Sequence, residues 1–363
     1  MVRIGLVGVG YWGPKLLRNL QSTPGCQVVA CCDRRRDRLE WVRETYPDIA
    51  VTENDLDLID ADIDAVVIAT PVRTHYALAK AFLSSGKHVL VEKPMTQTAE
   101  ESRDLIEVAD ANDRILMVGH TYQYKRSVQR IRDIIARGEL GNVLYVRSTR
   151  AHLGLVRADV NVIWDLAPHD ISIITYVLDS AVSTVSSHGL DHLQQGVEDF
   201  GQSTIVLENG TYAFIHNSWI NPDKVRSMSF IGTEKMLVWE EDGNREFIKL
   251  YEKETHSQGD GGFSWSYGDI HTARLDAHEA LGAECEHFID CVKNNVAPLT
   301  DGRSGLTVVE ALEASNISLR KRGAPISVSS IRESDRESVD VWNTTPLADR
   351  QAEPVLVPTQ SNG

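Results

Sequence analysis

The chain has 363 residues, of which 42% are hydrophobic and 25% are charged, and its formal net charge is −15. This length allows two domains with substantial cores. The acidic balance argues against nucleic acid or an anionic membrane as a partner, and no apolar run is long enough to span a bilayer. The 5 cysteines lack paired spacing and a strand begins by residue 3, so we expect reduced thiols, no signal peptide and a cytoplasmic location.

The first functional motif is the glycine-rich turn GVGYWG at residues 8–13. It follows an apolar segment that predicts a buried parallel strand, and it precedes a segment with helical spacing. A second apolar run then ends on Asp33. Strand, glycine turn, helix, strand and acid, in this order, predict a Rossmann dinucleotide site in which the glycines admit a pyrophosphate. The expected cofactor-binding residues of this half are Gly8, Gly10, Tyr11, Trp12, Gly13, Asp33 and Arg34.

Asp33 also bears on the choice of dinucleotide. Its carboxylate would bind the ribose hydroxyls of NAD and would repel the 2′-phosphate of NADP. Arg34, Arg35 and Arg36 follow directly, and a guanidinium beside the ribose could accept that phosphate; otherwise these side chains form a solvated basic face. We expect NAD as the cofactor, with NADP as the open alternative.

Strands and helices alternate in the first third of the chain. The predicted strands are residues 65–70, 88–91 and 115–118, and the predicted helices are residues 77–83, 99–111 and 127–137. This alternation predicts an α/β fold with a doubly wound parallel sheet, the Rossmann domain, over residues 1–121.

From residue 143 onward the pattern changes to half-buried strands joined by glycine turns, at residues 144–150, 203–207 and 212–216. Further helices are predicted at residues 170–178, 280–292 and 306–320. We expect a C-terminal α+β domain with an open, mostly antiparallel sheet over residues 122–329, used for substrate binding and oligomerisation. Residues 330–363 are polar and lack periodicity, which predicts a disordered tail.

Thr70, Pro71 and His75 lie at the carboxyl end of the strand predicted for residues 65–70. Since open α/β sheets bind ligands at this edge, we expect these residues to form a wall of the nicotinamide pocket. The same residues also suit the start of the next helix, and both interpretations can hold together.

Glu92 and Lys93 follow the next buried strand, at the same edge of the sheet, and we expect both to bind the cofactor there. Lys93 is therefore placed to reach a substrate hydroxyl or carbonyl near the nicotinamide. Pro94 keeps Lys93 extended and allows a cis bond between them. The alternative interpretation is a surface lysine that opens a loop.

Asp165 and His169 are four residues apart, so on one helical turn they share a face and can pair. A histidine supported by a carboxylate is suited to the proton transfer that accompanies a hydride. The alternative is a pair of polar residues at a helix start, where Asp170 is predicted to cap the helix at residues 171–178. No Cys/His grouping has the spacing of a metal site, so we expect no metal.

Together these motifs resemble the glucose–fructose oxidoreductase/inositol dehydrogenase (Gfo/Idh/MocA) family. The resemblance implies that Lys93 binds the reacting hydroxyl, that His169 is the general acid/base and that Asp165 orients His169. It also implies a second domain whose sheet forms the interface of a homodimer or homotetramer. The motifs that carry it are GVGYWG at 8–13, ATPVRTH at 69–75, GKHVLVEKPM at 86–95, GELGNV at 138–143, DLAPHD at 165–170 and ECEHFIDCVKNNVAPLTDGRSGL at 284–306.

The resemblance implies an NAD-dependent dehydrogenase for a secondary hydroxyl of a sugar. The GYWGP start and residues 267–270 look similar to the branch that acts at carbon 3 of nucleotide-activated or amino sugars. Alternatives are a cyclitol dehydrogenase of the inositol type, an NADPH-dependent 3-keto-sugar reductase and a non-catalytic dinucleotide-binding regulator. The expected substrate-binding residues are Lys93, Tyr122, Arg150, Asp165 and His169; Arg150, His152, Arg157 and Lys224 could also contact a phosphate or carboxylate, or could be solvated residues.

Overall fold

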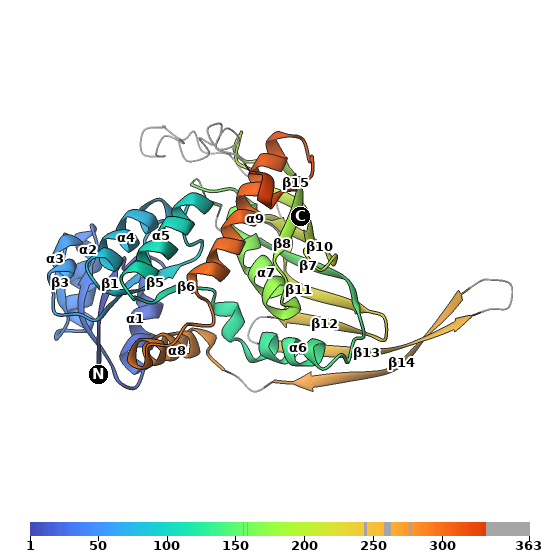
Figure 1. Ribbon diagram of the computed structural model, residues 1–363, viewed down its shortest axis with the longest axis horizontal. Coiled ribbons are helices and arrows are strands. Elements are labelled where there is room, and N and C mark those ends of the chain that lie inside the picture. Colours follow the sequence, from blue (N-terminus) through green and yellow to red (C-terminus); the bar gives the residue numbers. More distant parts are fainter. Residues whose placement is uncertain (155, 158, 243–244, 258–262, 276–277, 332–363) are drawn as a thin grey trace, which may run out of the picture.

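The computed structural model describes residues 1–331, apart from 155, 158, 243–244, 258–262 and 276–277. Two β-sheets form the framework, and helices lie around and between them (Figure 1). All but the first two residues of the predicted disordered tail, 330–363, lie outside the described residues. No described helix is long and apolar enough to cross a membrane.

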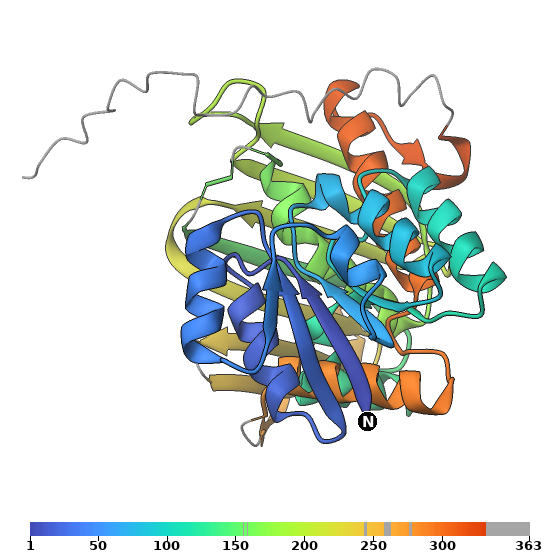
Figure 2. The ribbon, with the colours of Figure 1, turned by 90° about the vertical axis from the view of Figure 1, so that its left-hand side faces the viewer.

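The first sheet is parallel and has the strand order β3-β2-β1-β4-β5-β6. Its helices alternate with its strands along the chain, which confirms the predicted doubly wound Rossmann fold. Figure 2 shows this domain in front, with the second sheet behind it. The elements are β1 (Val2–Val7), α1 (Gly13–Ser22), β2 (Cys26–Cys32), α2 (Arg36–Thr45), β3 (Ala50–Thr52), α3 (Leu56–Ile59), β4 (Ala65–Ile68), η1 (Val72–Thr74), α4 (His75–Ser84), β5 (His88–Glu92), α5 (Ala99–Ala111) and β6 (Leu116–Gly119).

The strands of this sheet are apolar because helices cover both of its faces. All four residues of β4 and all four of β6 are buried. Since the six strands are parallel, their carboxyl ends lie at one edge, and the segments that follow β1, β4, β5 and β6 meet there. The topology therefore brings the glycine turn, Thr70, Lys93 and His120 to the same side of the domain.

The second sheet has the order β14-β13-β12-β11-β7-β10-β9-β8-β15. Its described strand pairs are antiparallel except for β7 with β10, which confirms the predicted mostly antiparallel sheet. In Figure 1 the hairpin of β13 and β14 extends well beyond the rest of the sheet. The strands are β7 (Val143–Leu153), β8 (Val182–Leu190), β9 (Phe200–Leu207), β10 (Tyr212–Ser218), β11 (Ile220–Gly232), β12 (Lys235–Asp242), β13 (Arg245–Ser257), β14 (Phe263–Arg274) and β15 (Ile326–Ser327).

Helices α8 and α9 connect the second half of the chain back to the Rossmann domain. Phe288 of α8 belongs to the same buried cluster as Leu16 of α1. Val309 of α9 belongs to a cluster that includes Val118 of β6 and Val185 of β8, so this helix packs against both halves. The remaining elements are η2 (Thr121–Tyr124), α6 (Arg126–Ala136), α7 (Val162–Leu178), α8 (Ala280–Asn294), α9 (Gly302–Arg320) and η3 (Val328–Ser330).

Helix α7 begins eight residues earlier than expected, which corrects the predicted capping role of Asp170. The helix cap is Asn161, whose side chain accepts a hydrogen bond from Trp164 N at 3.0 Å. Pro168 lies inside the helix, where it removes one backbone donor, before the predicted helix start at residue 170. Burial of the flanking apolar residues outweighs this loss, and Asp170 becomes a buried residue of the helix interior.

Candidate active site

The glycine turn after β1 has the geometry of a phosphate-binding turn. Gly8 has a φ of +98°, and a Cβ there would lie 2.6 Å from the carbonyl oxygen of Ala69. A Cβ on Gly13 would lie 2.2 Å from the carbonyl oxygen of Gly8, so this glycine lets α1 approach the strand. A Cβ on Gly10 would have no atom within 4 Å, which leaves space for a ligand above the turn. The residues present therefore fit a dinucleotide pyrophosphate.

Asp33 holds the glycine turn and the start of α2 together. Its Oδ2 accepts a hydrogen bond from Val9 N at 2.6 Å, and its Oδ1 accepts one from Arg35 N at 2.9 Å. Its half-buried carboxylate thus lies beside the turn, where the Rossmann arrangement places an adenosine ribose. The ribose contact itself stays a prediction.

The arginines after Asp33 are exposed. The Arg35 and Arg36 guanidinium groups form ion pairs with Asp37 and Glu53, at 2.6 Å and 2.8 Å. Arg34 forms no ion pair within the described part of the chain, so it is the arginine best placed to meet a 2′-phosphate.

The two aromatic residues of the turn differ in exposure. Tyr11 is 81% exposed, whereas Trp12 is half-buried and directly precedes α1. The Lys15 ammonium lies over both rings, 4.3 Å from the Tyr11 centroid and 4.4 Å from that of Trp12. The start of α1 therefore carries a positive side chain in addition to its helix dipole.

His75 connects two loops at the carboxyl edge of the sheet. It is 1% exposed, and its Nδ1 lies 2.9 Å from the carbonyl oxygen of Pro94 while its Nε2 lies 2.8 Å from that of Thr70. Burial lowers the pKa of this imidazole. The structure thus places His75 inside the protein, where it connects to the Lys93 loop, whereas Thr70 is half-buried and Pro71 is exposed. Their contact with the nicotinamide stays a prediction.

Lys93 reaches across to the second domain. Its Nζ donates a hydrogen bond of 2.8 Å to the backbone carbonyl of Asp165 in α7, and its peptide bond to Pro94 is cis. Burial lowers the pKa of Lys93, whereas the carboxylates of Asp165 and Glu92 oppose that shift. Burial likewise raises the pKa of Glu92 to about 7.

Asp165 and His169 lie on α7 as predicted, but the expected hydrogen bond between them is not formed. The Asp165 Oδ2 instead accepts a hydrogen bond of 3.1 Å from Trp219 Nε1, a residue 54 positions further along the chain. The Nδ1 of His169 is buried and has no hydrogen-bond partner within the described residues. Burial, followed by the charge of Lys93, lowers the pKa of His169 well below its usual value. His169 is therefore neutral near pH 7 and can accept a proton.

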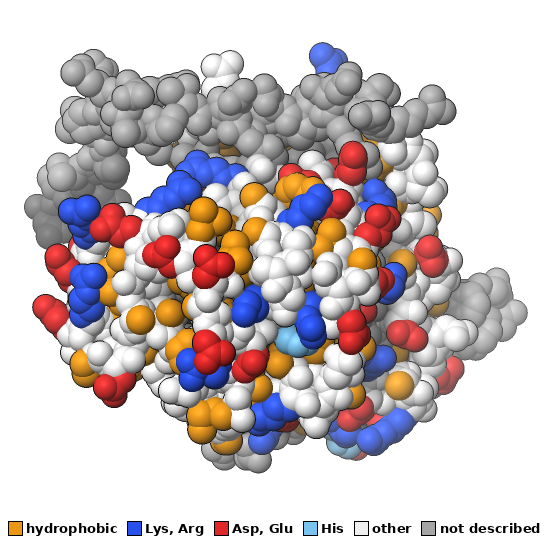
Figure 3. Space-filling view, turned by 60° about the vertical axis from the view of Figure 1, so that its left-hand side comes forward, with side chains coloured by type: hydrophobic (Ala, Val, Ile, Leu, Met, Phe, Trp, Pro, Cys, Tyr) orange, Lys and Arg blue, Asp and Glu red, His pale blue; other side chains and the backbone are white. Residues whose placement is uncertain are grey.

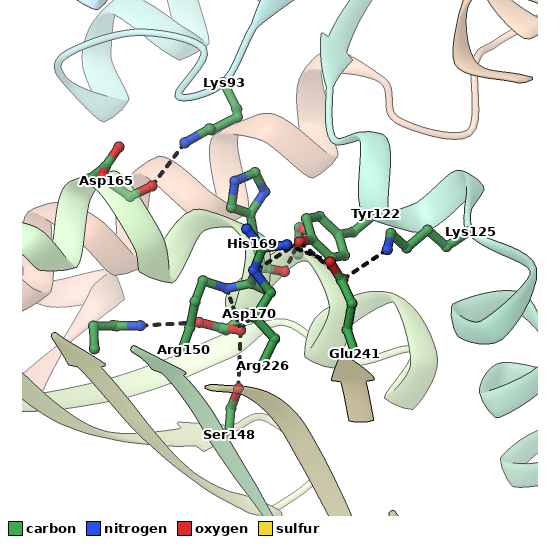
Figure 4. A network of polar contacts seen from close by, with 12 residues as sticks. Lys93, Tyr122, Lys125, Ser148, Arg150, Asp165, His169, Asp170, Arg226 and Glu241 are labelled. Atoms are coloured by element: carbon green, nitrogen blue, oxygen red, sulfur yellow. Dashed lines mark hydrogen bonds and ion pairs between the residues drawn. The ribbon is translucent and has the colours of Figure 1, made fainter. Parts of the chain in front are cut away.

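Tyr122 and Arg150 are drawn together beside His169 (Figure 4). The Tyr122 ring lies 4.9 Å from the His169 ring, and its hydroxyl accepts a hydrogen bond of 2.9 Å from Arg150 Nη1. Arg150 is 3% exposed, and its Nε and Nη2 donate to Asp170 Oδ1 at 3.2 Å and 3.1 Å. Ser148 and Asn217 also donate to Asp170. Arg150 thus belongs to a buried ion pair with Asp170. Tyr122 and Arg150 were both expected to contact the substrate, and of these two only Tyr122 is partly exposed.

Charged side chains at the rim of the site are mostly paired. Lys125 bonds to Glu241 at 2.8 Å and to Glu246, and Arg226 bonds to the other oxygen of Glu241. Arg157 pairs with Asp159 at 2.9 Å and lies 3.7 Å from Asp165. Lys224 is exposed, and His152 is half-buried. Over the face drawn in Figure 3, acidic and basic side chains are likewise interspersed.

His120, which follows the last strand of the parallel sheet, is a candidate site residue that the motifs of the sequence did not include. This residue is 1% exposed, and neither ring nitrogen has a hydrogen-bond partner within the described residues. Burial and the charge of Lys93 lower its pKa to about 3. Its place directly after β6, beside the strand that carries Lys93, was the signal that could have identified it.

Comparisons with known proteins agree with this geometry. The chain is 33% identical over 50% of its length to the uncharacterized oxidoreductase YdgJ of Escherichia coli, a match that spans 53% of that protein. It is 26% identical to a scyllo-inositol 2-dehydrogenase (NAD(+)) of Bacillus subtilis, over 87% of this chain and 93% of the other. The solved UDP-N-acetylglucosamine 3-dehydrogenase of Acidithiobacillus ferrooxidans superposes with a TM-score of 0.75 at 24% identity, over 88% of this chain and 98% of that chain.

Two family models match successive parts of the chain. The model of the oxidoreductase family with the NAD-binding Rossmann fold matches residues 2–120. The model of the GFO/IDH/MocA C-terminal domain matches residues 128–238. Together they span the glycine turn, Lys93, Asp165 and His169. This chain is therefore an NAD-binding oxidoreductase of the Gfo/Idh/MocA family.

Proposed function

We propose that this protein is an NAD-dependent dehydrogenase that oxidises a secondary hydroxyl on a polyhydroxylated ring. The observation that carries the proposal is the convergence of Lys93, from the Rossmann sheet, and His169, from α7, beside the glycine turn. Bound NAD supplies the hydride acceptor. The alcohol becomes a ketone as it loses a hydride from carbon and a proton from oxygen, and the protein positions the alcohol and receives that proton.

Lys93 and His169 divide this work. The Lys93 ammonium binds the reacting oxygen and stabilises the negative charge that develops on it. His169, kept neutral by its lowered pKa, accepts the hydroxyl proton. Asp165 contributes through its carbonyl group, which holds Lys93, and through its carboxylate, which is fixed by Trp219.

For the substrate we propose carbon 3 of a nucleotide-activated or amino sugar. The resemblance of the chain to the UDP-N-acetylglucosamine 3-dehydrogenase of Acidithiobacillus ferrooxidans, at 25% identity over 85% of this chain and 95% of that one, supports this choice. Exposed Lys224 and half-buried His152 are the residues that would meet a phosphate at the rim.

A cyclitol is the second candidate, and the charge balance of the site favours it. Lys125 and Arg226 are compensated by Glu241 and Glu246, and Arg150 is compensated by Asp170. An uncharged ring fits such surroundings without leaving a cation or an anion unpaired. The relative from Bacillus subtilis is named for such a substrate.

Initial rates with a panel of substrates test these alternatives. UDP-N-acetylglucosamine, free N-acetylglucosamine, scyllo-inositol and myo-inositol are incubated with NAD and then with NADP. A 3-keto-sugar is incubated with NADPH, and the absorbance of the reduced cofactor is followed in every case. We expect turnover of a nucleotide or amino sugar with NAD. Turnover of inositols alone would assign the cyclitol reaction, and activity only with a 3-keto-sugar and NADPH would assign the reductase. Tight binding of NAD without turnover of any compound would assign a regulator.

We further infer a homo-oligomer formed through the outer face of the second sheet. Tyr145, Tyr212 and Phe214 are 40%, 49% and 38% exposed and form a row of aromatic rings. The ring centroids of Tyr145 and Tyr212 lie 6.2 Å and 6.4 Å from that of Phe214. Exposed aromatic patches of this kind favour association. Phe214→Asp should lower the sedimentation coefficient, whereas Leu56→Asp on the exposed surface of the Rossmann domain should not.

A further inference from the structure

His120 is a buried imidazole whose polar atoms are left without partners at the centre of the site. Its Nδ1 and Nε2 are both inaccessible to solvent, and neither bonds to a described group. Buried polar groups in folded proteins are nearly always hydrogen-bonded, and an unpaired one destabilises the fold. Such a residue next to the proposed reacting groups indicates a partner that is engaged once the cofactor is bound.

The strand register places His120 beside Lys93. In the parallel pair of β5 and β6, Glu92 lies opposite Gly119, so the next residues along each strand are Lys93 and His120. Side chains alternate between the faces of a sheet, and residues in register point to the same face. A Cβ on Gly119 would lie 3.0 Å from the Glu92 carboxylate, which shows that Glu92 occupies the opposite face.

The chemistry of Lys93 calls for a second acceptor. Its ammonium has three N–H donors, and one of them bonds to the Asp165 carbonyl. A second donor binds the reacting oxygen in the proposed reaction. The Glu92 carboxylate is on the other face, and His169 must remain free to receive the substrate proton. The lone pair of a neutral imidazole on the same face as Lys93 suits the third donor.

We propose that His120 is a positioning residue that accepts a hydrogen bond from the Lys93 ammonium once NAD is bound, and so directs Lys93 toward the reacting oxygen. This inference rests on the proposed role of Lys93 in alcohol oxidation. His120 keeps the ammonium charged and fixes its direction before the substrate binds. Because burial lowers the pKa of His120 to about 3, its acceptor nitrogen is unprotonated near neutral pH.

The test uses two variants of His120 and a matched control on the same strand pair. His120→Phe keeps the ring but removes both nitrogens, and His120→Gln restores an acceptor. The control is His88→Phe at the opposite end of β5, because His88 is also buried and its Nδ1 accepts a hydrogen bond of 3.0 Å from Ile115 N. His88 lies outside the proposed site.

The first measurements do not depend on activity. The protein is labelled with ¹³C-lysine, and its NAD complex is studied by NMR. The Lys93 signal is assigned by its absence in Lys93→Arg, and its shift with pH gives the pKa of Lys93. His120→Phe should lower the pKa of Lys93, because the ammonium loses an acceptor, and His120→Gln should restore it. His120→Phe should also raise the midpoint of thermal unfolding, whereas His88→Phe should lower it by leaving the Ile115 N–H unpaired.

The kinetic measurement uses the alcohol that the wild-type protein turns over fastest. His120→Phe should reduce kcat by about tenfold or more and should move the alkaline limb of kcat to lower pH. His120→Gln should recover both, and the KM for NAD should stay unchanged. An unchanged Lys93 titration in His120→Phe, or a lower unfolding midpoint, would overturn the inference. If no alcohol is turned over, the proposed function fails, while the titration still decides the role of His120.

Discussion

The Lys93 ammonium donates a hydrogen bond of 2.8 Å to the backbone carbonyl of Asp165, and this contact joins the Rossmann sheet to helix α7. The two residues are 72 positions apart in the chain. The contact fixes the direction of Lys93 across the junction of the two domains, next to His169. It brings a lysine at the end of one sheet to the helix of the other domain that carries His169.

The first prediction concerns Lys93. Lys93→Ala should reduce kcat by at least about 100-fold, because the developing charge on the reacting oxygen loses its ammonium. The Kd for NAD should change little, since the contacts expected for its pyrophosphate and ribose come from the glycine turn and Asp33 and not from this side chain. Stopped-flow absorbance of the reduced cofactor measures kcat, and titration of the protein's tryptophan fluorescence with NAD measures the Kd. Lys80→Ala, which removes a partly exposed ion pair with Asp104, is the control and should change neither.

The second prediction concerns the pH dependence of His169. Because burial and the charge of Lys93 lower its pKa, the imidazole stays neutral below pH 6.5, and kcat/KM should hold its plateau there. His169→Ala should lose most activity near neutral pH and less at high pH, where hydroxide assists ionisation of the alcohol. A loss of equal size at every pH would mean that His169 only positions the substrate. Asp165→Asn should give a smaller defect, because the amide oxygen can still accept the bond from Trp219.

The third prediction concerns the choice of cofactor. Asp33→Ala should shift the ratio of kcat/KM for NAD over NADP toward NADP, since the carboxylate that repels a 2′-phosphate is removed. The variant should also bind both cofactors more weakly, because Asp33 holds the N–H groups of Val9 and Arg35. Glu44→Ala removes an exposed carboxylate of α2 and should leave the ratio unchanged. A strong preference of the unmodified protein for NADP would show that Arg34 governs the site.

The fourth prediction concerns the ion pair of Arg150 and Asp170, which are 3% and 1% exposed. Arg150→Met should reduce the free energy of unfolding by about 3 kcal/mol, because it leaves the Asp170 charge buried without its main partner. The double variant Arg150→Met/Asp170→Asn should lose less than the sum of the single losses. Urea unfolding measures all four proteins. Additive losses would contradict a direct interaction between the two side chains.

The fifth prediction concerns Glu284, a fully buried residue of α8. Burial and the neighbouring Glu92 raise its pKa well above the usual value. The folded state therefore holds a proton that the unfolded chain releases above about pH 4.3, so this group costs stability as the pH rises through that value.

Glu284→Gln removes this cost and should raise the free energy of unfolding near pH 7. The difference should vanish near pH 4, where Glu284 is protonated in both states. Denaturant unfolding at both pH values measures it. Glu313→Gln is the control, because the Glu313 carboxylate accepts a hydrogen bond of 3.1 Å from Ala99 N and its replacement should not stabilise the fold.

The sequence by itself determined the elements whose signals are local. Helix α5 spans the predicted residues 99–111, because its start is encoded by a capping box of Thr98 and Glu101. The glycine turn, the strand before it and Asp33 were also readable, since steric limits on glycine and strand periodicity act within a few residues. The same is true of Lys93, which directly follows a buried strand.

The tertiary structure decided the partners of the polar side chains. Asp165 accepts a hydrogen bond from Trp219 instead of from His169, and Arg150 forms an ion pair with Asp170. Contacts between strands and helices that are distant in the chain determine which buried charges are compensated. Helix α7 continues through Pro168 because its apolar faces are buried on both sides. The position of His120 beside Lys93 follows from the register of β5 and β6, which the sequence pattern does not specify. Local pattern places a residue on an element, but the packing of elements far apart in the chain determines what its polar atoms meet.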